Sequence, residues 1–262
     1  MSIIAGVILL FVLAPLLIIV PMSFSTAPSL QFPPPGYGLT YYREFVTDTR
    51  WTGALVNSII IATLTSIVTM AVAVPASFAI VRHRFRSRGL MTILLLLPLI
   101  APHIVLALGY YVYFGSLRLT QTYTGVVLAH SCISIPVVYL TVSAALKGFD
   151  RSIERAAMNL GAGPLRVFRH VTLPVLRPAF VAAALFAFVQ SFDETVIAIF
   201  ISGRDAATLP RQMFDSMRTQ ADPVVAVVST LLLAIVVAGV AGSRIVAARR
   251  AAFARRSVPV AA

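Results

Sequence analysis

The sequence predicts an all-α integral membrane protein with six transmembrane helices in a single domain, residues 1–262. Hydrophobic residues make up 59% of the chain and charged residues only 11%, about half of the charged share of an ordinary globular domain. A soluble core of this size could not bury so much apolar surface, so lipid must solvate much of the chain. The apolar residues also gather in segments of membrane-spanning length, which is the third observation behind this fold class.

Six segments are long enough to cross a bilayer, whose hydrocarbon core needs about 20 predominantly apolar residues per helix. They are residues 3–22, 53–81, 91–114, 122–146, 178–201 and 223–246. The first segment could be a secretory signal peptide, but no basic residue precedes it and no small-x-small cleavage site is evident, so we expect an uncleaved span. Prolines inside the spans predict kinks, because neighbouring helices can satisfy the freed carbonyls.

The distribution of Lys and Arg predicts the orientation, because cytoplasmic loops are enriched in these residues. With a cytoplasmic N-terminus, fifteen of them lie inside, in three regions: Arg82, Arg84, Arg86 and Arg88; Lys147, Arg151, Arg155, Arg166, Arg169 and Arg177; and Arg244, Arg249, Arg250, Arg255 and Arg256. The other six lie outside: Arg43, Arg50, Arg118, Arg204, Arg211 and Arg218. We therefore expect a multi-pass protein of the bacterial inner membrane with both termini in the cytoplasm.

The net charge of +12 does not point to nucleic acid, because the basic residues form short clusters between apolar runs and not one basic face with stacking aromatics. The single cysteine, Cys132, lies inside an apolar run. A lone thiol predicts neither a disulfide nor a metal site, so we expect a small packing residue and no bound metal.

The connection at residues 147–177 predicts a short amphipathic helix over Ser152–Leu160. Ser152 suits the N-cap, and Glu154 in the first turn lies near the positive end of the helix dipole. Gly161 suits the C-terminal stop. A second helical piece bounded by Pro174 and Pro178 is expected to follow.

This connection resembles the EAA loop of the permeases of binding-protein-dependent ABC importers. The positions that carry the resemblance are Glu154, Ala156, Ala157, Gly161, Leu173, Pro174 and Pro178. In that family the short helix is the coupling helix, which docks in a groove of the ATPase subunit. The resemblance assigns ATPase coupling to five residues, Glu154, Ala156, Ala157, Leu160 and Gly161. The alternative is a cytoplasmic loop that lies on the membrane surface.

The resemblance covers nearly all of the chain and implies the type I ABC importer permease fold. It implies several partners: a cytoplasmic dimer of ABC ATPases, a second permease subunit (a paralogue or an identical copy), a periplasmic substrate-binding protein and membrane lipid. The only lysine, Lys147, is followed by Gly148 and Phe149, so the sequence contains no phosphate-binding Gly-x-x-x-x-Gly-Lys-Ser/Thr motif. ATP and Mg are therefore expected on the partner ATPase, and the chain is expected to be a transporter subunit and not an enzyme.

Three further segments resemble the spermidine/putrescine group of these permeases. They are Ser191-Phe192-Asp193-Glu194, Ile201-Ser202-Gly203 and Thr208-Leu209-Pro210. This resemblance implies a translocation pathway for polyamines or a similar small cationic solute. The alternatives are a permease for ferric iron, thiamine or an organophosphonate, a non-transporting membrane scaffold, and an ion-driven carrier.

Asp193 and Glu194 are the charged residues predicted well inside a span, where a carboxylate costs about 2.5–3.5 kcal/mol and usually faces a cavity or a partner. On a continuous helix, Gln190 and Phe186 extend the face that carries Glu194. We expect Asp193, Glu194 and Gln190 to line the substrate pathway and to attract a protonated amine; the alternative is a structural carboxylate pair. An aspartyl protease would need a second intramembrane aspartate. His103 and His130 are expected to make structural hydrogen bonds, since nothing gives them metal-ligand spacing.

Overall fold

The computed structural model describes residues 2–219 and 221–256, and it confirms the all-α prediction. Contacts divide the chain into two units. One unit holds the described residues up to Thr52 and those from Asp215 onwards, and the other holds Gly53–Phe214. We describe each unit by itself, and the prediction of a single domain over residues 1–262 stays a prediction.

Five helical stretches of the described residues are long and apolar enough to cross a membrane: Ile4–Ser23 in α1, Thr49–Arg82 (α3), Tyr123–Gly148 (α6), Pro164–Phe192 and Val224–Ile245 in α12. The helix pair α4 (Arg88–Ile100) and α5 (His103–Ser116) passes the same test together, although the two helices are bent by 105° at their junction. The count is therefore five candidate spans, or six when the bent pair is one span.

The span over residues 91–114 was predicted to be kinked at its prolines, but the structure shows a break, because α4 ends at Ile100 and α5 begins at His103. The cause is Pro102, which disfavours helical geometry in the residue before it. Ala101 accordingly has extended backbone angles, φ −72° and ψ 136°.

The predicted fifth span, residues 178–201, is also corrected. The helical stretch begins at Pro164 as α8 (Pro164–Val167), continues through a π-helical turn η1 (Phe168–Thr172) and ends as α9 (Leu173–Phe192). Pro174 and Pro178 therefore lie inside the helical stretch and do not mark the ends of a separate helix. In this wide turn the Leu173 N–H donates to the Phe168 carbonyl, five residues earlier. The turn thereby accommodates Pro174, which has no N–H to donate. After α9 the chain breaks at Asp193–Thr195, before α10 (Val196–Ile201).

In the unit Gly53–Phe214, α6 packs against α4, α9 and α10, and α5 packs against α10. One buried cluster joins Ile61 of α3 to residues of α5, α6 and α10. A second cluster joins Ala73 of α3 to α6 and to Leu176, Ala183 and Ala187 of α9. Hydrogen bonds link distant segments in the same unit: the Ser66 hydroxyl donates to the Ala184 carbonyl, and the Leu209 N–H of α11 (Leu209–Thr219) donates to the Ser58 hydroxyl.

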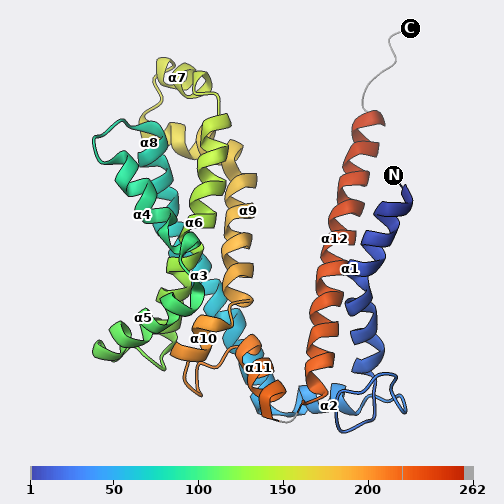
Figure 1. Cartoon of the computed structure of the whole chain (residues 1–262). Helices are drawn as coiled ribbons and strands as arrows, with labels where there is room; N and C mark the ends of the chain where they lie inside the picture. The colour runs from blue at the N-terminus through green and yellow to red at the C-terminus, as the bar shows by residue number, and fades with distance from the viewer. Residues whose placement is uncertain (1, 220, 257–262) are drawn as a thin grey trace. The chain divides into compact units, whose positions relative to one another are not determined.

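Shorter helices lie at the two opposite ends of this unit. The short helix α7 (Ser152–Asn159) lies at one end, whereas α5 and α10 lie at the other (Figure 1). The long helices α6 and α9 run between the two ends.

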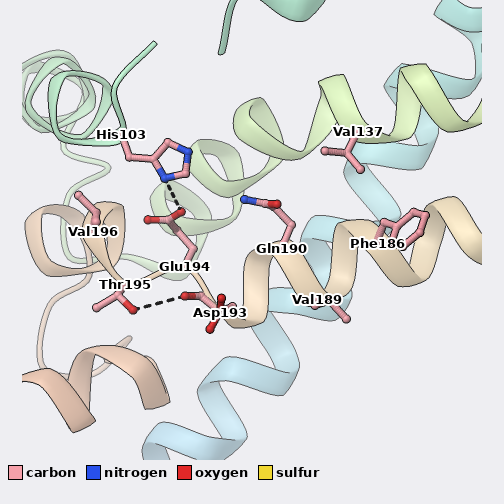
Figure 2. Close-up of a pocket in the computed structure, with 9 residues that line it drawn as sticks. All are labelled: His103, Val137, Phe186, Val189, Gln190, Asp193, Glu194, Thr195 and Val196. Atoms are coloured by element: carbon pink, nitrogen blue, oxygen red, sulfur yellow. Dashed lines mark hydrogen bonds and ion pairs between the residues drawn. The ribbon is translucent and has the colours of Figure 1, made fainter. Parts of the chain in front are cut away.

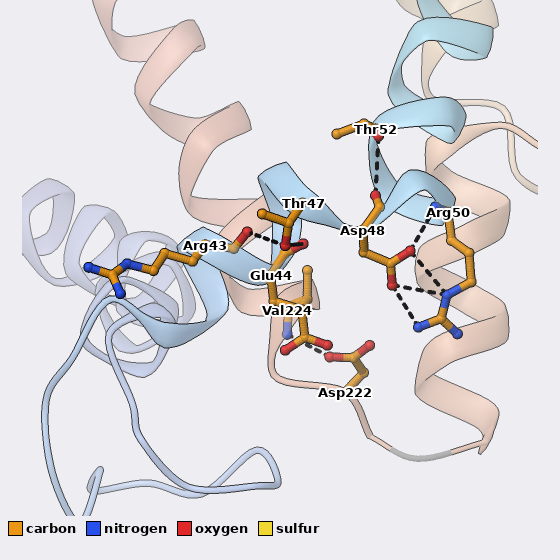
Figure 3. A network of polar contacts seen from close by, with 8 residues as sticks. All are labelled: Arg43, Glu44, Thr47, Asp48, Arg50, Thr52, Asp222 and Val224. Atoms are coloured by element: carbon orange, nitrogen blue, oxygen red, sulfur yellow. Dashed lines mark hydrogen bonds and ion pairs between the residues drawn. The ribbon is translucent and has the colours of Figure 1, made fainter.

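In the other unit, α12 (Val224–Arg256) packs against α1 (Ser2–Ser23) and against the short helix α2 (Thr40–Thr47). Figure 3 shows a polar network at α2 and the start of α3, where the Arg50 guanidinium pairs with Asp48 at 2.7 Å. Asp222 accepts a hydrogen bond from the Val224 N–H and so satisfies one of the free donors at the start of α12.

Candidate solute cavity and coupling helix

The break between α9 and α10 is held by the Glu194 side chain, which is buried. One carboxylate oxygen accepts the Ile197 N–H at 3.0 Å, which satisfies a free donor in the first turn of α10. The other oxygen lies 3.1 Å from Nδ1 of His103, the first residue of α5 (Figure 2). Glu194 therefore joins two helix breaks that are far apart in the sequence.

Asp193 has the opposite environment, although it is the next residue in the chain. Its side chain is exposed and points away from His103, whereas Glu194 points toward it (Figure 2). Among the described residues, no ion pair involves the Asp193 carboxylate. The Thr195 hydroxyl donates to the Asp193 backbone carbonyl and not to the side chain.

A cavity of about 370 Å³ lies at this break. Its polar lining comes from His103, Gln190, Asp193, Glu194 and Thr195, and its apolar lining from Val137, Phe186, Val189 and Val196. The three residues predicted to line the pathway, Gln190, Asp193 and Glu194, thus meet in one cavity. The assumed geometry was wrong, because Asp193 and Glu194 follow the end of α9 and share no helix face with Phe186.

Sequence reasoning missed His103 as a member of this cavity. It was expected to make a structural hydrogen bond, but its contact with Glu194 joins distant segments that no local pattern connects. His130 makes a hydrogen bond of the expected kind: its Nδ1 lies 2.9 Å from the Ser191 hydroxyl, between α6 and α9.

The helix α7 occurs where the loop pattern placed it, over Ser152–Asn159. The predicted N-cap is wrong by one residue, because Ser152 is already helical and Arg151 holds the N-cap position. The Asp150 carboxylate accepts from both the N–H and the hydroxyl of Ser152. These two hydrogen bonds hold the pKa of Asp150 below its ordinary value. Gly161 ends the helix with φ +87°, a left-handed conformation that favours glycine.

Most of the α7 surface is open. Ala156 and Gly161 are exposed, Ala157 is half-buried, and Leu160 has 89% of its surface exposed. Glu154 is the exception among the five predicted coupling residues, because only 5% of its surface is exposed and its carboxylate is paired with Arg82 at 2.8 Å. The open face therefore lies on the side of α7 opposite to Glu154.

Long apolar helices, an acid-lined cavity and a short exposed helix at the opposite end of the same unit define a membrane permease. Residues 70–252 match the family described as "Binding-protein-dependent transport system inner membrane component". The chain belongs to this family, as the EAA-like loop predicted. It is a multi-pass inner-membrane transport component and not an enzyme.

Relatives with similar sequences cover most of the chain. The "Putrescine transport system permease protein PotI" of Escherichia coli (strain K12) is 34% identical over 85% of this chain and 82% of its own length. The "Spermidine/putrescine transport system permease protein PotC" of Haemophilus influenzae (strain ATCC 51907 / DSM 11121 / KW20 / Rd) is 27% identical over 80% of this chain and 82% of its own length.

The fold also resembles that of a solved structure. A chain of a bacterial ABC transporter involved in the import of the acidic polysaccharide alginate superposes with a TM-score of 0.70 at 15% identity. The match covers 94% of this chain and 93% of that one. The predicted fold class, an ABC importer permease fold, is confirmed by this similarity together with the family match.

Proposed function

We propose that this chain forms the translocation pathway of an ATP-driven importer for polyamines, of the putrescine and spermidine class. The observation that carries the proposal is the exposed carboxylate of Asp193 in a cavity that also has an apolar wall of Val137, Phe186, Val189 and Val196. The names of the relatives support it, because PotI and PotC are named as permease proteins for these solutes.

The cavity has the chemistry that a protonated alkylamine needs. The Asp193 carboxylate can offset one ammonium charge, and the Gln190 side-chain carbonyl can accept an N–H from the same group. The half-exposed ring of Phe186 offers a face that attracts cations. The methylene segment of the solute can pack on Val137, Val189 and Val196. An anionic solute would meet two carboxylates here, which disfavours it.

Glu194 has a separate role in this proposal. Its two oxygens are used by His103 and by the Ile197 N–H, so it holds the cavity wall and leaves Asp193 as the group that meets the solute. The pathway proposed for Asp193, Glu194 and Gln190 is thereby kept, with Glu194 as a positioning residue.

The proposed partners follow from the family and from the exposed helix. A cytoplasmic ATPase dimer would bind ATP and Mg and contact α7 through Ala156, Ala157, Leu160 and Gly161. A periplasmic substrate-binding protein would deliver the solute, and a second permease subunit would complete the pathway. In this arrangement α7 and both termini lie in the cytoplasm, and the cavity lies toward the periplasmic side.

Solute-stimulated ATPase activity of the reconstituted complex tests this function. Putrescine, spermidine, thiamine, a ferric chelate and an organophosphonate are compared at equal concentration with their matching binding proteins. We expect putrescine or spermidine to stimulate hydrolysis, and thiamine, the ferric chelate and the organophosphonate to leave it at the basal rate. Stimulation by another solute alone would refute the polyamine assignment.

The variant Asp193→Asn tests the carboxylate that carries the proposal. We expect polyamine uptake to fall by about tenfold or more, since about 1.4 kcal/mol of lost attraction already gives that factor. The matched control is Asp205→Asn, which removes an exposed carboxylate of the same unit that does not line the cavity. Equal uptake by the two variants would show that Asp193 does not meet the solute.

A further inference from the structure

Arg82 lies where four segments of the unit Gly53–Phe214 meet. It is in the last turn of α3, and its guanidinium donates to the Glu154 carboxylate of α7 at 2.8 Å, across 72 positions of sequence. Its guanidinium carbon lies 4.7 Å from the ring centre of Phe78 and 5.8 Å from that of Phe149, the residue that follows α6. The fourth segment is η1, because the Thr172 hydroxyl donates to the same Glu154 oxygen.

The two charges are placed where helix dipoles favour them. Arg82 is at the C-terminal end of α3, where a cation is stabilised, and Glu154 is in the first turn of α7, where an anion is stabilised. The side chain of Arg82 keeps 18% of its surface exposed and that of Glu154 keeps 7%. Removing one member would leave the other charge poorly solvated, so the pair holds α7 firmly to α3.

The η1 turn adds a third fixed point. Thr172 is buried, and its position in a π-helical turn directs the hydroxyl toward Glu154 just before α9 begins. Such turns are frequent at functional sites. The ring of Phe168 in the same turn meets Phe78 of α3 edge-on, with 5.8 Å between the ring centres, so η1 contacts α3 as well as α7.

We propose that Arg82 is the positioning residue through which α7 moves the membrane helices: displacement of α7 is passed by Glu154 to Arg82 and Thr172, and from them to α3, the end of α6 and α9. In this arrangement Glu154 acts inside the permease and does not contact the ATPase. The inference rests on the proposed function, since it needs an ATPase that displaces α7.

The test separates an internal link from a direct contact with the ATPase. Arg82→Gln and Glu154→Gln remove one charge each. The double variant Arg82→Glu with Glu154→Arg, called the exchanged pair, restores an attraction with the two charges in exchanged positions. Arg84→Gln and Arg155→Gln are the matched controls, because both change exposed basic residues beside the pair. Arg82→Lys keeps the positive charge if the neutral variant is lost from the membrane.

The readout needs no solute. A cysteine is introduced at Val189, which lies on the cavity wall. Its labelling by a thiol reagent is measured in the complex with and without ATP. The partner ATPase used is a form that cannot hydrolyse ATP. We expect ATP to change the labelling rate of the parent complex by about fivefold or more, a usual size for coupling between distant sites. Co-purification of the ATPase reports docking separately.

An internal link predicts that Arg82→Gln and Glu154→Gln both lose the ATP-dependent change while the ATPase still co-purifies. The exchanged pair is expected to recover only part of it, because the attraction between α3 and α7 returns while the Thr172 hydroxyl has no acceptor on an arginine. The controls and Arg82→Lys are expected to resemble the parent. A normal response in Arg82→Gln or in Glu154→Gln would overturn the proposal. Failure of polyamines to stimulate hydrolysis would instead overturn only the solute assignment, because this readout does not use one.

Discussion

Two adjacent carboxylates at the end of α9 have different physical environments and therefore different expected roles. Glu194 is buried with both oxygens in use, whereas Asp193 is exposed in the cavity. A carboxylate whose two oxygens already contact a histidine and a helix N–H has little to gain from a solute. An exposed carboxylate can exchange its bound water for an ammonium group of the solute.

This division predicts that two isosteric changes differ in their effect on the free energy of unfolding. Glu194→Gln removes the charge that faces His103, so we expect the free energy of unfolding to fall by about 1–3 kcal/mol. Asp193→Asn removes an exposed charge and is expected to change it by less than about 0.5 kcal/mol. Thermal unfolding of the purified protein in detergent measures both. The same loss for the two variants would contradict the division.

Glu44 of α2 carries a testable dependence on pH. Burial raises the pKa of Glu44, the carboxylates of Asp222 and Asp48 raise it further, and Arg50 opposes them (Figure 3). A carboxyl group whose pKa is higher in the folded state binds its proton better there. Its contribution therefore favours folding at low pH and is lost as the pH rises from the ordinary pKa of glutamate through the raised one.

We expect Asp222→Asn to lower the pKa of Glu44 while keeping the oxygen that accepts the Val224 N–H. The pH dependence of unfolding should become weaker in the same interval, since one source of repulsion is gone. Carboxyl-carbon NMR resolves the titration, because the chain contains only three glutamates, Glu44, Glu154 and Glu194. An unchanged Glu44 titration would show that Asp222 does not affect it.

At the scale of the element, α7 is a short helix with one anchored side and one open side. Because helix positions advance by about 100°, Ala156 and Leu160 lie on the side opposite to the buried Glu154. Leu160 is almost fully exposed. Both side chains are therefore accessible to the proposed ATPase partner.

We expect Ala156→Trp to leave the permease folded in the membrane and to prevent the ATPase from co-purifying, because a large ring blocks close approach at this face. Leu117→Trp is the matched control, since Leu117 is also exposed but follows α5 at the other end of the unit. ATPase retention at the parent level by Ala156→Trp would remove this face from the docking surface.

Gly161 predicts a second effect on the same helix. Its N–H donates to the Met158 carbonyl and the following Ala162 N–H donates to the Ala157 carbonyl, so the left-handed residue closes the helix end. We expect Gly161→Ala to destabilise this end by about 1–2 kcal/mol and Gly161→Asn by less, because asparagine tolerates the conformation better. Amide hydrogen exchange across α7 measures this effect. We expect the fastest exchange in Gly161→Ala, slower exchange in Gly161→Asn and the slowest in the parent protein.

The positions of the helices could be predicted from the sequence better than the breaks between them. Apolar length and proline content were sufficient to place the helices near their true positions, and the loop pattern located α7 to within one residue at its C-terminal end. The break at Ala101–Pro102 was read as a kink, because proline occurs in continuous membrane helices as well as at their ends. The break at Asp193–Thr195 has no proline or glycine to mark it.

The candidate cavity could be predicted only in part. Gln190, Asp193 and Glu194 are neighbours in sequence, so a local pattern found them. The contacts of Glu194 with His103 and of Glu154 with Arg82 join distant helices, and no periodicity in one segment predicts its partner in another. The inward direction of Glu154 was missed for this reason.

At the scale of the whole molecule, the path of the bent pair α4 and α5 determines on which side of the membrane each later segment lies. If the pair crosses the bilayer as one span, α7 lies on the same side as the residues between α3 and α4. If the pair turns back as a re-entrant loop, α7 lies on the opposite side, away from a cytoplasmic ATPase.

Cysteine labelling separates these two topologies. Cysteines introduced at the exposed residues Ser87 and Ser116 flank the bent pair, and Ser152 reports on α7. We expect a membrane-impermeant thiol reagent added to spheroplasts to label Ser116→Cys and to spare Ser87→Cys and Ser152→Cys. Labelling of Ser87→Cys and Ser116→Cys from the same side would refute the six-span topology. Ser257, near the C-terminus, lies outside the described residues and serves as a further reporter of the predicted cytoplasmic end.

The break between α4 and α5 also bears on how the protein is made. The two helices contain 13 and 14 residues, and at about 1.5 Å per residue each is roughly 20 Å long. That is shorter than a hydrocarbon core of about 30 Å, so neither helix can be recognised as a span when it leaves the ribosome alone. If the pair crosses the bilayer as one span, α4 and α5 must therefore enter the lipid together, after α5 has been synthesised. In that topology, synthesis of the permease includes a stage at which α4 has left the ribosome while the rest of its span has not yet been made.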